Sequence, residues 1–134
     1  MNGRGRAVNG TRIIAIGAAL GALAVVLGAF GAHALRARVT PDLLEIYETA
    51  VRYHFYHALA LVLTGIWADR VGSTVMPPGV IGAAGFFLVG VAIFSGSLYL
   101  LVLTGLRWLG AVTPIGGLAL IVGWLFLLRA ALAR

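Results

Sequence analysis

The chain has 134 residues, of which 61% are hydrophobic and only 10% are charged. A soluble domain of this length buries about two-thirds of the surface of its unfolded chain. The composition therefore excludes a water-soluble globular domain and indicates a membrane protein. The net charge of +6 comes from ten arginines that lie singly or in pairs between apolar stretches, which is typical of topology signals rather than of a nucleic-acid surface. Since the chain has no cysteine, disulfides and thiol catalysis are also excluded.

Residues 1–12 are polar, glycine-rich and basic, and they predict a flexible N-terminal segment. The remainder, 13–134, is predicted to form one transmembrane domain. Its first apolar run, Ile13 to Leu35, is long enough to span a hydrocarbon core of about 30 Å as a helix. A cleaved signal peptide is the alternative, since a small-x-small site stands at Ala32 to Ala34. The run exceeds the usual signal-peptide core of about 7 to 15 residues, which favours a retained span.

The next segment is predicted to be one long helix with two different halves. Thr40 is expected to cap it and Pro41 to occupy its first turn. From Asp42 to Tyr56 the pattern is amphipathic, and from Phe55 to Ala68 it is almost wholly apolar. Because the apolar half is short for a span, part of the amphipathic half is expected to enter the membrane interface or the protein interior.

Two further spans follow a polar turn at Gly72 to Thr74 and a break at Pro77 to Gly79. The 24 residues Val80–Leu103 carry no charge, and Trp108–Leu128 is also apolar. The short connection between these runs predicts an antiparallel hairpin. Pro114 is expected to kink or loosen the last helix. The predicted fold is an all-α, polytopic four-transmembrane-helix bundle with an amphipathic helical extension before the second span.

Basic residues predict the orientation of the four spans. Six arginines fall on one side of the membrane and four on the other, so both termini are expected in the cytoplasm. Tryptophan and tyrosine side chains near the span ends are expected to form an aromatic belt. The six arginines are Arg4, Arg6, Arg12, Arg70, Arg129 and Arg134, the four are Arg36, Arg38, Arg52 and Arg107, and the aromatic residues are Trp67, Tyr99, Trp108 and Trp124.

Small residues recur along three of the predicted spans and predict close helix packing, because they allow two backbones to approach each other. In the first span they repeat at intervals of four and three. The same stripes would serve either contacts within the bundle or a homo-oligomer. They are Gly17, Gly21, Ala24, Gly28 and Gly31 in the first span, Gly82, Gly85, Gly90 and Gly96 in the third, and Gly110, Gly117 and Gly123 in the fourth.

Four segments carry a family resemblance that extends from about Ile13 to Leu128. They are GAFGAHAL at Gly28, ETAVRYHFYHALAL at Glu48, FSGSLYLL at Phe94 and RWLGAVTPIGG at Arg107. With them the chain resembles the family of small four-helix bacterial inner-membrane proteins catalogued as a domain of unknown function, which has a small eukaryotic transmembrane relative. The resemblance implies four spans in the bacterial cytoplasmic membrane and no established activity. His54 departs from the glutamine expected there.

Eight polar residues in or beside the spans are candidates for a functional site, because polar groups in hydrocarbon are costly. Glu48 and Arg52 are spaced for an ion pair on one helix face. Three interpretations stay open for this pair, namely a solvated surface pair, a buried pair tied to Arg107 or His33, and a proton or anion relay. The eight candidates are His33, Glu48, Arg52, His57, Ser95, Ser97, Arg107 and Thr113.

His57 is expected to be structural, hydrogen-bonded to a carbonyl or to Ser97, rather than a metal ligand. With His54 it would place two imidazoles on one helix face, but the ligand set looks incomplete for a metal site. For Ser95, Ser97 and Thr113 the expected role is helix-to-helix hydrogen bonding. No nucleophile set and no phosphate-binding or dinucleotide motif is recognisable. The sequence predicts no enzyme, no metal and no cofactor.

The function favoured by these observations is that of a structural or accessory membrane component. A small oligomeric transporter or channel with a polar site around Glu48, Arg52 and His57 is the alternative. An enzyme or cofactor binder using His33, His54 and His57 as ligands is the least favoured of the three. The expected partners are the lipid bilayer and either further copies of the chain or a larger membrane complex, and no nucleic acid.

Overall fold

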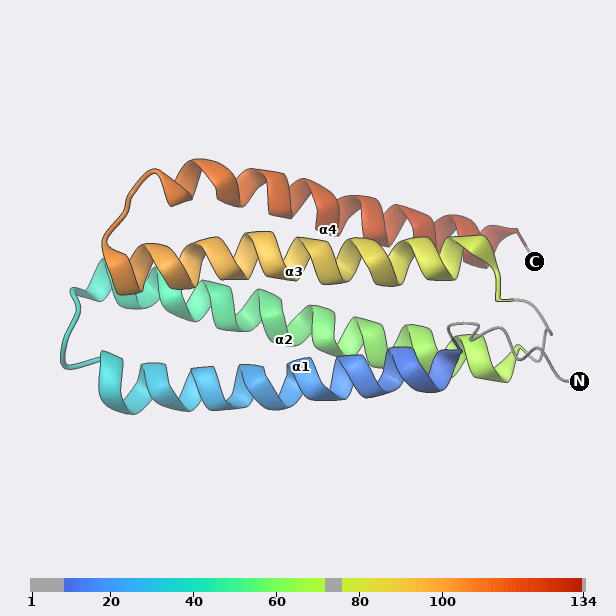
Figure 1. Ribbon diagram of the computed structural model, residues 1–134, viewed down its shortest axis with the longest axis horizontal. Helices are drawn as coiled ribbons and strands as arrows, with labels where there is room; N and C mark the ends of the chain where they lie inside the picture. The colour runs from blue at the N-terminus through green and yellow to red at the C-terminus, as the bar shows by residue number, and fades with distance from the viewer. Residues whose placement is uncertain (1–8, 72–75, 134) are drawn as a thin grey trace, which may run out of the picture.

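The computed structural model describes residues 9–71 and 76–133, and every element within them is helical. The chain forms α1 (Gly10–Phe30), a π-helical turn η1 (Gly31–Leu35), α2 (Pro41–Arg70), α3 (Pro78–Thr104) and α4 (Leu109–Leu132). Figure 1 shows the four α-helices side by side along one common axis. The predicted all-α fold with four long helices is confirmed.

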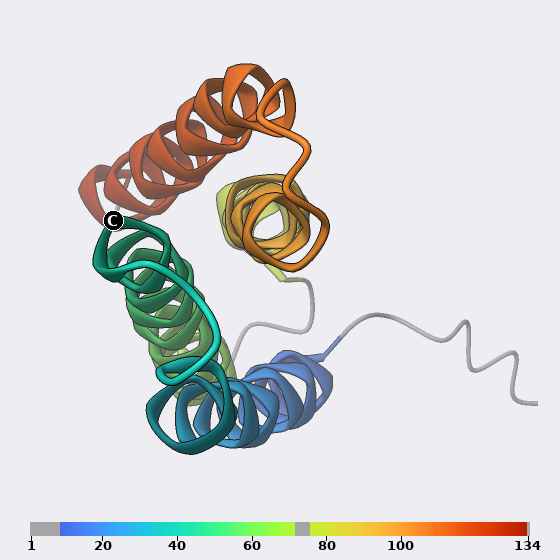
Figure 2. The same cartoon turned by 90° about the vertical axis from the view of Figure 1, so that its left-hand side faces the viewer.

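Successive helices run antiparallel, and each packs on the next one in the chain. α1 contacts α2, α2 contacts α3, and α3 contacts α4, and the end view in Figure 2 shows the same neighbours. α1 and α3 therefore point in one direction, and α2 and α4 in the other. As a result, the start of α1 and the end of α4 lie at the same end of the bundle (Figure 1).

The start of α1 is fixed by side chains, and it comes earlier than the predicted Ile13. The Asn9 side chain accepts a hydrogen bond from the Arg12 backbone N–H at 3.1 Å, which caps the helix. Thr11 Oγ1 donates to Asp69 Oδ2 at 3.2 Å and ties the start of α1 to the end of α2. Of the predicted flexible segment, residues 1–8 lie outside the described residues, as does the predicted turn at Gly72 to Thr74.

α2 joins the amphipathic and apolar halves in one continuous helix, as predicted. Thr40 stands at the N-cap position, but its side chain makes no capping hydrogen bond, and Pro41 occupies the first turn. The hairpin between α3 and α4 is also confirmed. It turns at Gly105, whose φ of +74° suits a residue without a side chain and whose N–H bonds to the Leu101 carbonyl at 2.8 Å.

α4 runs through Pro114 without interruption. Pro114 lies near the start of the helix, in its second turn, and its ring is on the exposed surface. A proline so close to the N-terminus removes only one hydrogen bond from a long helix. The loosening predicted at this position therefore does not break the span into two pieces.

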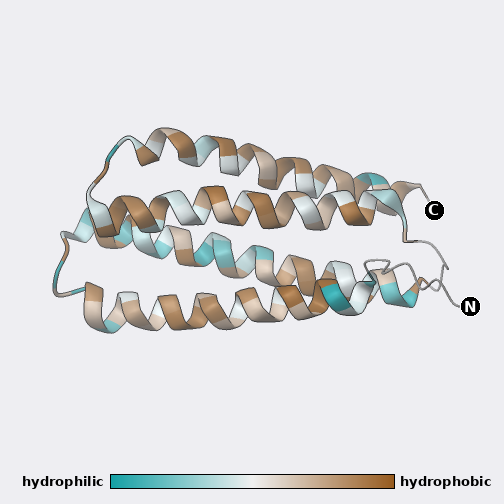
Figure 3. Ribbon diagram, viewed as in Figure 1, coloured by the Kyte–Doolittle hydropathy of each residue, from teal (hydrophilic) through white to brown (hydrophobic). Residues whose placement is uncertain are grey.

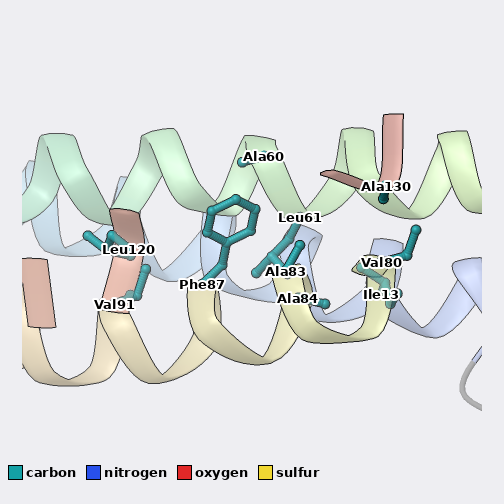
Figure 4. Packing of buried hydrophobic residues seen from close by; sticks show 10 residues of the cluster. All are labelled: Ile13, Ala60, Leu61, Val80, Ala83, Ala84, Phe87, Val91, Leu120 and Ala130. Atoms are coloured by element: carbon teal, nitrogen blue, oxygen red, sulfur yellow. The ribbon is translucent and has the colours of Figure 1, made fainter. Parts of the chain in front are cut away.

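The core is formed by apolar side chains from all four helices. Ile13 of α1, Leu61 of α2, Phe87 of α3 and Leu120 of α4 are all buried in one cluster, and Figure 4 shows its side chains spread along the interior of the bundle. A second cluster around Tyr47 and Leu101 fills the end that carries the η1 turn. Large apolar side chains also cover the outside, as the brown surfaces of α1, α3 and α4 in Figure 3 indicate.

The small residues of α1 face α2. A Cβ at Gly17 would lie 2.8 Å from the Ala58 carbonyl, and one at Gly31 would lie 2.7 Å from the Tyr47 ring. Both distances are shorter than van der Waals contact, so only glycine allows this approach of the two helices. Gly28 likewise faces Val51, and Ala24 is buried.

The α3–α4 contact uses only part of the set of glycines that the sequence indicated. Gly82 and Gly90 of α3 lie against Phe126 and Leu120 of α4, whereas no atom lies within 4 Å of the Cβ positions of Gly85 and Gly96. Gly116, which the prediction omitted, lies directly against the Phe94 backbone, and Gly123 lies against the Phe87 ring. Gly110 and Gly117 make only ordinary contacts, at 3.5 and 3.6 Å from the nearest neighbouring atoms. Five of the six buried residues of α4 repeat at intervals of four and three, a pattern that includes Gly116 and excludes both of these glycines. They are Leu109, Thr113, Gly116, Leu120 and Gly123.

Three described stretches are long and apolar enough to cross a membrane, namely Gly10–Leu35, Pro78–Thr104 and Leu109–Leu132. α2 is long enough to cross a membrane but is not apolar enough to be counted with these three, because its first half is polar. The prediction of four membrane spans therefore remains a prediction for α2, although the helix lies alongside the other three over their length (Figure 1).

A test of the α3–α4 contact compares two glycines of the hairpin. Gly116→Ala should lower the free energy of unfolding by about 1 to 3 kcal/mol, because the added methyl collides with the Phe94 backbone. Gly96→Ala should be neutral or stabilising by up to about 1 kcal/mol, since no atom lies within 4 Å of its Cβ position. Unfolding in detergent micelles, followed by circular dichroism, measures both. Equal effects of the two substitutions would contradict the packing described here.

Candidate functional site

Hydroxyl groups of α3 join this helix to both of its neighbours. Ser95 Oγ donates to the Ala50 carbonyl of α2 at 2.8 Å, and Ser97 Oγ lies 2.7 Å from Thr113 Oγ1 of α4. The Ser97 and Thr113 hydroxyls can each also donate to a carbonyl of their own helix, that of Phe94 for Ser97 and that of Leu109 for Thr113. One hydroxyl therefore donates across to the other, and the second donates to its own helix. All three side chains are buried, which agrees with the helix-to-helix role expected for them.

His54 belongs to a polar chain that crosses the bundle from α1 to α3. Its Nδ1 shares a hydrogen bond with the Tyr99 hydroxyl at 3.1 Å, and the Tyr99 ring packs on Tyr47 with centroids 5.2 Å apart. The Tyr47 hydroxyl then donates to the Leu27 carbonyl of α1 at 2.9 Å. His54 is 3% exposed, and its Nε2 makes no hydrogen bond of normal geometry among the described residues, although the Leu20 backbone is close enough to interact.

His57 is held at both ring nitrogens. Nε2 accepts a hydrogen bond from Trp124 Nε1 of α4 at 3.1 Å, and Nδ1 lies 2.7 Å from the Tyr53 carbonyl. Since Trp124 can only donate, Nε2 carries no proton and Nδ1 must donate, which defines a neutral tautomer. The Phe87 ring of α3 packs against both His57 and Trp124. His57 is therefore a structural link between three helices, bonded to a carbonyl as expected and not to Ser97.

Glu48 and Arg52 lie on the outside of α2, away from His57. Both side chains are exposed, and among the described residues neither forms an ion pair. Arg52 Nη2 instead donates to Thr49 Oγ1 at 3.4 Å. The two side chains line a groove of about 220 Å³ between α2 and the end of α1, whose opposite wall is formed by Gly28, Gly31 and Ala32. The candidate site of Glu48, Arg52 and His57 is thus divided between the outer surface and the core.

The position of Glu48 and Arg52 along the bundle axis follows from the contacts of neighbouring α2 residues with α3. Ala50 bonds to Ser95, and the Tyr53 ring packs on Phe94, so Arg52 is level with this part of α3. At 1.5 Å per residue, the nine residues from Ser95 to Thr104 place that level about 14 Å from the end of α3. Arg52 therefore does not lie at the end of the bundle.

Exposed apolar side chains surround the charged pair at the same level. Val26 of α1 is 63% exposed and Leu118 of α4 is 62% exposed. Still nearer the end of the bundle, Leu103 and Trp108 are also exposed. In Figure 3 the teal of hydrophilic residues runs along the half of α2 that lies beside the brown of α1 and α3. A charged side chain at the centre of a membrane span costs about 2.5 to 3.5 kcal/mol on insertion scales.

The remaining candidates, His33 and Arg107, lie at the same end of the bundle. His33 is exposed in the π-helical turn η1, and Arg107 is exposed in the turn between α3 and α4. Neither contacts the Glu48 and Arg52 pair through an ion pair or hydrogen bond among the residues that the structure describes. The described part of the chain also holds no group of three or more histidine and acidic side chains arranged to bind a metal ion.

The interior network has an aromatic half that the sequence pattern did not predict. Tyr47, Tyr99 and Trp124 donate to or share hydrogen bonds in the core, whereas Tyr99 and Trp124 were assigned to an aromatic belt. Trp124 lies eight residues before the end of α4 and its indole N–H bonds to His57, and the aromatic belt stays a prediction. A helical-wheel comparison gives the missing signal, since Tyr47, His54 and Leu61 fall on the same face of α2 at intervals of seven.

The helices, their apolar outer surface and the hydrogen bonds between them define an α-helical membrane protein. The chain belongs to the DUF423 family, described as proteins of unknown function, whose family model matches residues 27–117. The resemblance inferred from the four sequence segments is thereby confirmed.

Its relatives include bacterial proteins of nearly the same length. The UPF0382 membrane protein YwdK of Bacillus subtilis strain 168 is 42% identical over 119 residues, which cover 88% of this chain and 94% of that protein. The UPF0382 membrane protein SH2409 of Staphylococcus haemolyticus is 44% identical over 116 residues, 86% of this chain and 90% of the relative. No solved structure matches the chain.

The interior network is tested by removing one hydroxyl. Tyr99→Phe leaves buried His54 without its hydrogen bond at Nδ1, so the free energy of unfolding should fall by about 1 to 2 kcal/mol. Tyr56→Phe is the matched control and should change it by less than about 0.5 kcal/mol, since Tyr56 is 55% exposed. Unfolding of both variants in the same detergent gives the comparison. A neutral Tyr99→Phe substitution would show that the hydroxyl does not support His54.

Proposed function

We propose that this protein is a structural or accessory component of the bacterial cytoplasmic membrane, and that it is not an enzyme. The observation that carries the proposal is the use of the interior polar groups. Ser95, Ser97, Thr113 and His57 each form a hydrogen bond that joins two helices. Groups occupied in this way stabilise the bundle and are not available to bind and release a substrate.

Four membrane spans are part of this proposal, and the direction of the helices supports them. α1 and α3 are both long and apolar enough to cross a membrane, and they point the same way. The chain must therefore return across the bilayer between them, and α2 is the helix that runs this course. With 30 residues it extends about 45 Å, more than the hydrocarbon core of about 30 Å requires.

We place both termini in the cytoplasm. Arg12, Arg70 and Arg129 belong to helix ends at one end of the bundle, and Arg36, Arg38 and Arg107 to connections at the other. With the arginines of the two terminal segments, the first end carries the majority. The positive-inside rule assigns that end to the cytoplasm.

A small oligomeric transporter or channel is the second candidate. It is favoured by the groove of about 220 Å³ that holds Glu48 and Arg52. His57 does not line this groove, because both its nitrogens are bonded inside the bundle. A polar path would therefore have to form between copies of the chain rather than within one.

The topology is tested with reporters that are active on one side of the membrane only. Fusions after Met1 and after Arg134 should both report the cytoplasm, and an insertion at Leu106 should report the opposite side. Alkaline phosphatase and green fluorescent protein provide the two readouts. Opposite signals from the two termini would contradict the four-span arrangement.

A measurement of ion flux with the purified protein distinguishes the two candidate functions. A structural or accessory role predicts that proteoliposomes of the pure protein conduct no ions above empty vesicles, and that Glu48→Gln changes nothing. A transporter predicts a flux that Glu48→Gln abolishes, whereas the exposed control Glu45→Gln retains it. Ion flux measured with a fluorescent indicator decides between them. A flux that depends on Glu48 would overturn the structural role.

A further inference from the structure

The outer surface of α2 carries a stripe of exposed side chains that repeats at the spacing of a helix–helix seam. We call it the outer stripe, and it begins with charged residues and ends with apolar ones. Its members follow one another at intervals of three, four or seven residues, which keeps them on one face of a helix. They are Glu45, Glu48, Arg52, Leu59, Leu63 and Ile66, and all are exposed.

None of the other helices within residues 9–71 and 76–133 covers the outer stripe. α1 packs beside it and α3 behind it, as the end view in Figure 2 shows. If α2 crosses the membrane as proposed above, the apolar half of the stripe faces lipid without cost. The charged half does not, because Arg52 is level with Val26 and Leu118, which are exposed and apolar. A partner for the charged half is therefore required on energetic grounds.

We propose that the outer stripe is a two-fold interface between two copies of this chain, in which Glu48 of each copy pairs with Arg52 of the other. The two-fold axis is normal to the membrane, so the two α2 helices run parallel. An interface of this kind brings the same surface of both copies together, and each contact occurs twice. Glu48 and Arg52 stand one helical turn, about 6 Å, apart along α2. In a parallel pair the acid of one copy therefore reaches the base of the other diagonally across the seam.

Charge complementarity favours a second copy over other occupants. The stripe carries an acid and a base on one face, and it is complementary to itself. A lipid phosphate would contact Arg52 but would be repelled by Glu48 and Glu45. It would also have to descend about 14 Å from the end of α3 to reach Arg52. The apolar half continues the same seam, since Leu59, Leu63 and Ile66 of two parallel helices interlock in the manner of a coiled coil.

The proposed pair also explains the state of these side chains in one copy. Glu48 and Arg52 are spaced for an ion pair within α2, yet among the described residues the Arg52 side chain donates a hydrogen bond only to Thr49. The carboxylate therefore remains available for a partner. The groove of about 220 Å³ beside both side chains gives a second copy room to approach.

The interface is tested first by cross-linking, for which a chain without cysteine is well suited. Leu59→Cys on the outer stripe should form a disulfide-linked species of twice the 14.0 kDa chain mass on oxidation in membranes. Ile121→Cys on α4 is the control, since it is also an exposed apolar position in the middle of its helix. Equal cross-linking at both positions, or none at Leu59→Cys, would overturn the proposal.

Charge exchange then tests the ion pairs themselves. Glu48→Arg in one copy and Arg52→Glu in another give each copy two like charges on the stripe. Each variant alone should lose cross-linking through Leu59→Cys about tenfold, which corresponds to about 1.4 kcal/mol. Co-expression of the two, with different tags, should restore the mixed species to within about twofold of the wild type, because only the mixed dimer pairs acid with base.

Co-expression of the two variants distinguishes the two-fold interface from an ion pair within one helix and from a different partner protein. Its result does not depend on the test of the four-span topology. If the pair forms within one helix, both variants have lost it, and mixing them restores nothing. Cross-linking of Leu59→Cys to a different protein would assign the stripe to another partner and overturn the two-fold interface. Membrane yield and helical content of each variant identify failures of folding, in which case Glu48→Gln and Arg52→Gln replace the reversals. The topology reporters are read independently of all these results.

Discussion

The direction of α2 is the constraint on which the rest of this structure depends. α1 and α3 point the same way, so the connecting helix must run the length of the bundle in the opposite direction. Its first half carries Glu45, Glu48 and Arg52, which no apolar span would contain. The fold therefore places charged residues beside helices whose outer surfaces are apolar. The proposals about function depend on how the free-energy cost of charged side chains in an apolar environment is offset.

Polar groups inside the bundle and polar groups on its outer surface make different contacts. Inside, Tyr47 bonds to a backbone carbonyl of α1, Ser95 to one of α2, and Trp124 to the His57 ring, so these groups hold helices together where lipid supplies no hydrophobic drive. Outside, Glu48 and Arg52 make no comparable bond to another helix. This contrast supports a stabilising role for the interior and an assembly role for the outer face of α2.

Much of the fold was predictable because hydropathy and helix signals are local. The union of both halves of α2 followed from Pro41 and from the continuous periodicity, and the hairpin followed from the short connection before Trp108. The glycines were only partly predictable. Gly31 was identified because its stripe has regular spacing, whereas Gly116 was passed over for Gly117, since two adjacent glycines look alike until the rotation of α4 against Phe94 is known.

By itself, the sequence determined that this is a membrane protein, how many helices it has and in what order, and to which family it belongs. These properties depend on composition, on local periodicity and on short segments of the chain. Only the tertiary structure decided which polar residues meet. It bonded His57 to Trp124, 67 positions away, and left Glu48 and Arg52 on the outer surface. The physical reason is that the rotation of each helix about its axis is set by packing against its neighbours, and no local pattern encodes it.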